Sequence, residues 1–149
     1  MPVNPEIVGR VFPPTAPYLV GREKVREFSR AVFANDPQHV DPEAARALGY
    51  ADVVAPPTFA MVVQDLTLQQ LISAPDSGIV LSRVIHAEQR FRYTRAIVAG
   101  DELTAQLTVT GIRTLGGNAM VTSDAEVVDA DGAHVVTATS VLLVGQASE

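Results

Sequence analysis

The sequence has 149 residues, of which 47% are hydrophobic and 19% charged, and its net charge is −6. This composition is typical of one globular domain, expected over residues 1–149, and it excludes a disordered chain. Scattered basic residues in an acidic chain disfavour nucleic-acid and anionic-membrane binding, and the absence of cysteine excludes disulfides and thiolate chemistry.

The start of the chain and its apolar runs give no sign of export or membrane insertion. Residues 1–6 lack the positive region and apolar run of a secretory signal. No apolar stretch approaches the roughly 20 residues of a membrane span. We therefore expect a cytoplasmic protein, and we expect neither a metal nor a cofactor.

The first elements in chain order are an extended segment and an amphipathic helix. Prolines at 13, 14 and 17 favour an extended lead-in to a short strand at 18–20. Residues 22–33 then place three apolar side chains at helical spacing and leave a charged outer face: Val25, Phe28 and Val32. A polar turn over 35–39 ends this helix, because the residue before a proline avoids the helical region.

Two further helices are expected in the middle of the chain. A short one over 42–48 begins after Asp41, a good N-terminal cap, and stops at Gly49. A longer helix extends from a cap at Thr58 to about Ser73 and is apolar on most of its circumference. Such a helix, in a chain without a membrane span, must be wrapped by other structure.

Everything after Gly78 predicts strands. The expected strands are 90–94, 103–109, 119–128 and 134–144. The turns between them are Gly100-Asp101, Gly116-Gly117-Asn118 and Asp131-Gly132. One buried helix against one antiparallel sheet indicates an α+β hotdog fold, in which a curved sheet wraps a long central helix. Its open edge strands favour a homodimer or a related heterodimer.

Two motifs carry a resemblance to the MaoC-like hotdog dehydratases. Residues 97–103 (IVAGDEL), preceded by Phe91, resemble the strand–turn–strand "F-x-x-P-[IV]-x-x-G-D-x-L" of that family. Residues 35–41 (NDPQHVD), followed by 53–59 (VVAPPTF), resemble the (R)-specific enoyl hydratase stretch "G-D-x-N-P-x-H-x-[DN] … A-H-G". The first motif identifies the fold, and the second is the one that carries chemistry.

The resemblance implies a mechanism on acyl thioesters. In the family, an aspartate and a histidine share a water and act as general acid and base. A backbone N–H of the later glycine polarises the thioester carbonyl. Here His39 falls on the histidine and Asp36 on the asparagine, whereas Ala34 replaces the aspartate. Pro57 replaces the glycine, and proline has no N–H to donate.

The whole chain is also similar to the A- and C-type subunits of the actinobacterial (3R)-hydroxyacyl-ACP dehydratase, in which a separate hotdog subunit supplies the aspartate and histidine. The resemblance implies an acyl-CoA or acyl-ACP substrate and a homodimer or a heterodimer with a catalytic subunit. The candidate catalytic residues are His39 and Asp36. The candidate substrate contacts are Tyr50, Pro57, Thr58, Phe59 and Val62.

Three functions stay open on the sequence alone. The first is a dehydratase or enoyl hydratase subunit that needs a partner, and the second is a homodimeric enzyme that uses Asp36 and His39. The third is a non-catalytic module that binds an acyl thioester or another small molecule, in which His39 is an ordinary turn residue. A thioesterase is disfavoured, because Asp65 is the only carboxylate on the central helix and lies one turn too deep. His86 is interpreted as structural and His134 as solvated.

Overall fold

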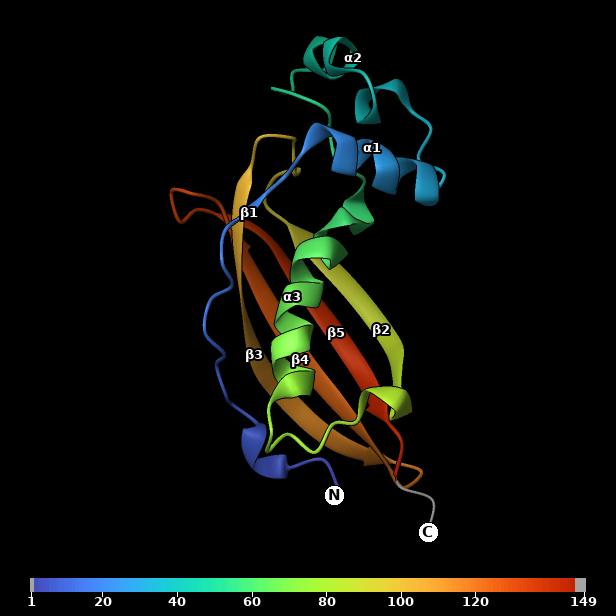
Figure 1. Ribbon diagram of the computed structural model, residues 1–149, viewed down its shortest axis with the longest axis vertical. Coiled ribbons are helices and arrows are strands. Elements are labelled where there is room, and N and C mark those ends of the chain that lie inside the picture. Colours follow the sequence, from blue (N-terminus) through green and yellow to red (C-terminus); the bar gives the residue numbers. More distant parts are fainter. Residues whose placement is uncertain (1, 147–149) are drawn as a thin grey trace.

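A five-stranded antiparallel sheet forms the body of the protein, and the computed structural model describes residues 2–146. Across the sheet lie β1 (Tyr18–Leu19), β3 (Glu102–Leu115), β4 (Asn118–Val128), β5 (His134–Val144) and β2 (Val84–Tyr93). The sheet curls round α3 (Ala60–Ser73), which lies along its concave face (Figure 1). The predicted α+β hotdog fold is confirmed.

The two central strands match their predicted bounds closely, whereas the other two long strands are longer than predicted. β2 begins at Val84 rather than at residue 90, and β3 continues to Leu115 rather than ending at residue 109. Side chains in both extensions are largely exposed, so burial does not alternate there. Backbone pairing to β5 and β4 holds these extensions in the sheet, and hydrophobic periodicity therefore missed them.

One edge of the sheet is covered and the other is open. Residues 9–15 run along β3, where the N–H groups of Gly9 and Phe12 donate to the carbonyls of Val109 and Leu107 at 2.8 and 2.9 Å. At the opposite side, β2 pairs with β5 alone, and its outer edge meets no other strand within residues 2–146. The open edge is therefore a full-length strand with unpaired backbone groups.

A small cap of helices sits at one end of the sheet (Figure 1). It consists of α1 (Arg22–Ala31), the 3-10 turn η2 (Pro37–His39) and α2 (Pro42–Ala47). Asp41 caps α2 as predicted, because its side chain accepts from the Glu43 N–H at 3.0 Å. The helix α1 is shorter than predicted and ends before Phe33, which has the left-handed φ of 58°.

The start of the central helix differs from the prediction. The 3-10 turn η3 (Pro57–Phe59) leads into α3, and no side chain caps either element. The prediction that Thr58 caps the helix is therefore wrong. Proline at the first position of the turn has the φ that the turn needs and no N–H to satisfy, so the turn forms without a cap. Two other 3-10 turns, η1 (Pro5–Ile7) and η4 (Leu81–Arg83), lie outside the helices.

A polar layer divides the core beneath α3 into two hydrophobic clusters. One cluster includes Phe59 and Val63, and the other includes Leu68 and Leu71. Between them lie four fully or almost fully buried polar residues: Gln64, Thr67, Ser123 and Ser140. The Gln64 Nε2 donates to the Ala138 carbonyl at 3.2 Å, and the two serine hydroxyls lie 3.1 Å apart.

The helix is wrapped on the side that faces the sheet, where this polar layer lies. Its opposite side exposes Asp65, Gln69 and Ser73. Within the described chain, no helix is both long enough and apolar enough to cross a membrane. The prediction of a wrapped central helix thus holds for one face.

The buried amide of Gln64 generates a stability prediction. Gln64→Glu should lower the free energy of unfolding at pH 7 by at least about 2–3 kcal/mol, because the new carboxylate is buried beside the Ala138 carbonyl oxygen. Burial raises the pKa of such a carboxyl in the folded protein, so the loss should shrink as the pH falls from neutral toward about 4.3, the unfolded value, and level off below it, where the carboxyl is protonated in both states. Urea unfolding across this pH range measures it.

The matched control is Gln69→Glu, on the exposed side of the same helix beside Asp65. It should cost no more than a few tenths of a kcal/mol, because the new charge stays in water. Equal losses in the two variants would contradict a buried polar layer beneath α3.

Candidate functional site

A cleft of about 400 Å³ opens where the cap meets the start of α3 and the end of β2. Its walls come from two stretches of the chain that are far apart in sequence, residues 38–57 and 93–97. The residues that line it are Gln38, His39, Leu48, Tyr50, Val54, Ala55, Pro57, Tyr93, Ala96 and Ile97. Most of them are apolar, and no lining residue is a carboxylate.

A hydrogen bond of the His39 ring, together with one of its neighbour Gln38, holds His39 against the segment at Val54 in the wall of this cleft. Its Nδ1 lies 2.6 Å from the Val54 carbonyl oxygen, and the Val54 N–H donates to the Gln38 carbonyl at 2.9 Å. A carbonyl oxygen can only accept, so Nδ1 carries the proton. In the neutral ring, Nε2 is then the atom that can accept a proton. This is the tautomer that a general base in the cleft requires.

The structure does not bring Asp36 into the same cleft. Asp36 precedes η2 and is exposed, and its side chain makes no capping bond. The Asp36 carbonyl accepts from the His39 N–H at 3.1 Å, but among the described residues the Asp36 carboxylate forms no hydrogen bond or ion pair with the His39 ring. Ala34, which stands at the aspartate position, is half-buried and has no ionisable group. The cleft therefore holds one of the two groups that the family motif uses.

The predicted substrate contacts divide into two groups. Tyr50 and Pro57 line the cleft. Thr58 is exposed beside the cleft. Phe59 is fully buried, and its ring packs edge-on against the ring of Phe28, with 5.3 Å between the ring centroids. Val62 lies one turn further along α3 and is half-buried. The last three residues are thus outside the lining.

Sequence reasoning missed Tyr93, the last residue of β2. Its hydroxyl donates to the carbonyl oxygen of Pro57 in the cleft wall. Burial raises the pKa of Tyr93 to about 12, so the phenol stays protonated at neutral pH. In the sequence this tyrosine is one of several aromatic and β-branched strand residues. Only its position opposite Pro57 distinguishes it.

The other histidines lie outside the cleft. His86 is exposed, and its Nε2 lies 3.0 Å from Gln89 Oε1. His134 is half-buried rather than solvated, and it contacts Thr94, Thr137 and Glu126. Within residues 2–146, no group of three or more histidine and acidic side chains could hold a metal ion.

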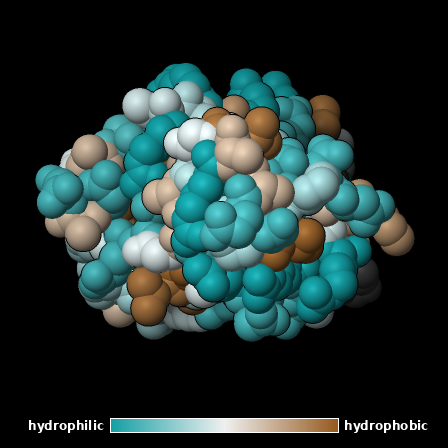
Figure 2. Space-filling model, turned by 90° about the horizontal axis from the view of Figure 1, so that it is seen from above, coloured by the Kyte–Doolittle hydropathy of each residue, from teal (hydrophilic) through white to brown (hydrophobic). Residues whose placement is uncertain are grey.

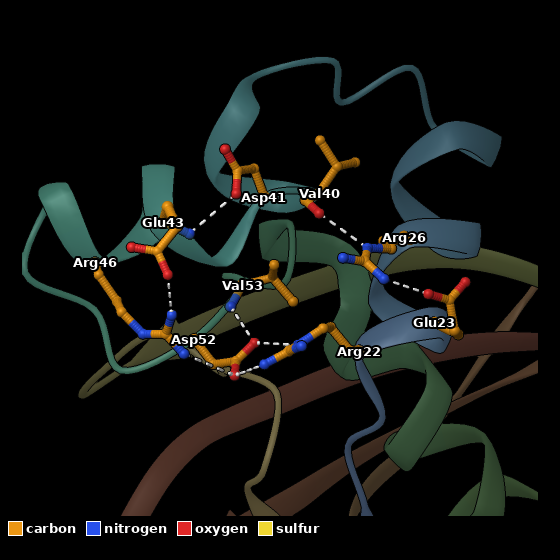
Figure 3. A network of polar contacts seen from close by, with 9 residues as sticks. All are labelled: Arg22, Glu23, Arg26, Val40, Asp41, Glu43, Arg46, Asp52 and Val53. Atoms are coloured by element: carbon orange, nitrogen blue, oxygen red, sulfur yellow. Dashed lines mark hydrogen bonds and ion pairs between the residues drawn. The ribbon is translucent and has the colours of Figure 1, made fainter.

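A charged network fastens the cap to the segment that carries Val54 (Figure 3). Arg22 of α1 makes two hydrogen bonds to Asp52, at 2.9 and 2.7 Å, and Arg46 of α2 lies 3.9 Å from the same carboxylate. These bonds, above all the Arg22 hydrogen bond, lower the pKa of Asp52 to about 2. Arg26 also donates to the Val40 carbonyl at 2.9 Å. Side chains of two helices thereby hold one wall of the cleft.

The outer surface of the cap is mostly hydrophilic. Figure 2 views this end of the molecule from above and shows small, separate hydrophobic patches in a polar surface. Two exposed apolar side chains belong to the cleft itself, Leu48 and Tyr50, at 63% and 38% exposure. The apolar wall of the cleft therefore continues to the surface on the side of α2.

Comparison with known proteins agrees with this fold. Residues 6–138 match the family described as FAS1-like, dehydratase domain region. A UPF0336 protein from Clavibacter michiganensis is 67% identical over 97% of each chain.

Two solved structures are also similar. The HadBC (3R-hydroxyacyl-ACP dehydratase) complex from Mycobacterium tuberculosis contains a chain with a TM-score of 0.82 and 32% identity, over 92% of this chain and 96% of that one. A structure described as a MaoC-like dehydratase has a TM-score of 0.87 and 36% identity, over 94% of this chain and 42% of that one.

Removing the shared carboxylate of the network tests how the cap is held. Asp52→Asn should lower the free energy of unfolding at pH 7 by about 1 kcal/mol, because it breaks a bidentate pair that is only partly exposed. The pKa of Asp52 is lowered in the folded protein, so its contribution is present above pH 4 and is lost as the pH falls toward about 2. The difference from the wild type, measured by urea unfolding, should shrink at about pH 3.

The control is Asp76→Asn, which breaks the exposed bidentate pair with Arg10 away from the cleft. It should change stability by less than Asp52→Asn does, because water screens an exposed pair. A larger effect from Asp76→Asn than from Asp52→Asn would show that the cap is held by other contacts.

Proposed function

The chain belongs to the family of FAS1-like dehydratase domains and has their MaoC-like hotdog fold; from this premise we propose that it is one subunit of a (3R)-hydroxyacyl-thioester dehydratase. The reaction is the reversible removal of water from a hydroxyacyl thioester, which in reverse is the hydration of a trans-2-enoyl thioester. The substrate is an acyl-CoA or an acyl-ACP, and a partner subunit supplies part of the catalytic machinery.

One observation carries the proposal, namely a cleft with a correctly oriented histidine and no carboxylate. Water elimination needs a base for the carbon-bound proton and an acid for the departing hydroxyl. His39, with Nε2 as the acceptor, fits one of these roles. Since Asp36 lies outside the cleft and Ala34 has no ionisable group, the second role falls to a residue of another chain.

The open edge of β2 is the surface proposed for that partner. β2 is an edge strand over its whole length, and its last residue, Tyr93, lines the cleft. A chain paired along this edge would place its own residues close to the cleft. The similar HadBC structure is itself a (3R)-hydroxyacyl-ACP dehydratase complex, which supports a partner for this chain. Either a second copy or a related hotdog chain fits this edge, which gives a homodimer or a heterodimer.

A binding module without catalysis is the second candidate. Pro57 favours it, because proline at the position of the family's carbonyl-polarising glycine removes a donor that the reaction uses. The cleft could then hold an acyl thioester without converting it. A homodimeric enzyme based on Asp36 and His39 would need Asp36 to enter the cleft.

The test is hydration of a medium-chain trans-2-enoyl thioester, followed as loss of enoyl absorbance. The purified chain alone should show no turnover. Mixed with a hotdog chain that carries an intact aspartate–histidine motif, it should raise the activity of that chain, and His39→Ala should reduce this gain by tenfold or more. His134→Ala, at a histidine of β5 that is outside the cleft and not on the β2 edge, is the matched control and should leave the gain unchanged.

Other outcomes distinguish the alternatives. Turnover by the chain alone that vanishes in His39→Ala would show a self-sufficient hydratase and contradict the need for a partner. Binding of the thioester without turnover in any mixture would establish the binding module.

A further inference from the structure

The phenol of Tyr93 lies next to the atom where a donor is missing. Pro57 has no N–H, and the Tyr93 hydroxyl is hydrogen-bonded to the carbonyl oxygen of the same residue. The nitrogen and oxygen of one residue are only about 3 Å apart, so the hydroxyl lies within roughly 6 Å of the proline nitrogen. Both residues line the cleft that also contains His39.

The hydroxyl can donate only one hydrogen bond. At present it donates to the Pro57 carbonyl oxygen, which holds the phenol oxygen beside that residue. The ring is half-buried and stacks obliquely on Phe91, with 6.2 Å between centroids, so the aromatic ring is held while the O–H can rotate. Because its pKa is raised to about 12, the phenol is a donor throughout the neutral and mildly alkaline range.

We propose that the Tyr93 hydroxyl donates the hydrogen bond to the carbonyl oxygen of a bound acyl thioester, in place of the backbone N–H that Pro57 lacks. The ligand carbonyl takes the proton now donated to the Pro57 carbonyl, so one carbonyl acceptor replaces another. Tyrosine hydroxyls serve as donors of this kind in other carbonyl-polarising sites. The proposal rests on the proposed function, because it requires that the cleft take an acyl thioester.

The experiment compares two ligands that differ only in the carbonyl. Octanoyl-pantetheine is a thioester, and S-octyl-pantetheine is the thioether without the carbonyl oxygen. Neither can react, since neither has a double bond or a hydroxyl on its acyl or alkyl chain. Their dissociation constants for the full chain are measured by NMR chemical-shift titration, with the wild type, Tyr93→Phe and Tyr18→Phe. Tyr18 lies in β1 and does not line the cleft, so its variant controls for loss of a hydroxyl.

The wild type and Tyr18→Phe should prefer the thioester roughly three- to tenfold, as expected of one hydrogen bond. Tyr93→Phe should bind both ligands equally, and thermal unfolding should show that it is folded. If both ligands bind and Tyr93→Phe keeps the preference, another donor such as the Thr58 N–H is used, and the proposal for Tyr93 is overturned while the proposed function survives. If Tyr93→Phe weakens both ligands equally, Tyr93 only shapes the cleft, which also overturns it. If neither ligand binds the wild type, the proposed function fails and the role of Tyr93 fails with it.

Discussion

The packing of α3 against the concave face of the sheet is the constraint on which the rest of the structure depends. A helix with buried side chains at 60, 63, 67 and 71 must lie along a surface that curves round it, and the long strands β3, β4 and β5 provide that surface. The register of the helix on the sheet then decides where its first turn stands. Pro57 therefore lies opposite the end of β2, where its carbonyl accepts from the Tyr93 hydroxyl, and these two residues form one wall of the cleft.

The cap depends on this same wall. The segment that precedes α3 passes Asp52 and Val54, which the cap binds through Arg22 and His39 respectively. The contact that orients the imidazole is therefore also one of the contacts that hold the cap in place. Function and stability are difficult to separate at His39, whereas the Asp52 pair stabilises the cap without entering the cleft.

The cleft contains polar groups that can bind a ligand but no carboxylate. It offers an imidazole, a neutral phenol and apolar walls, which suit the binding and orientation of an acyl chain and a carbonyl. A complete dehydratase site needs a further acidic or basic group. β2 is an open edge of the sheet and, through Tyr93, also part of the cleft wall, so a partner chain on this edge, as proposed, would stand beside the cleft.

The sequence by itself determined the element order, the turns at Gly100, Gly116 and Gly132, the cap at Asp41 and the family. These features can be predicted because local propensity, hydrophobic periodicity and short motifs depend only on residues that are close in the sequence. Only the tertiary structure decided that the Asp36 side chain stays outside the cleft and that Tyr93 meets Pro57 across 36 positions of sequence. The extra length of β2 and β3 was decided there as well, because strand pairing rather than side-chain burial holds their ends. Such contacts between distant segments arise from how the helix is seated on the sheet, which no local pattern records.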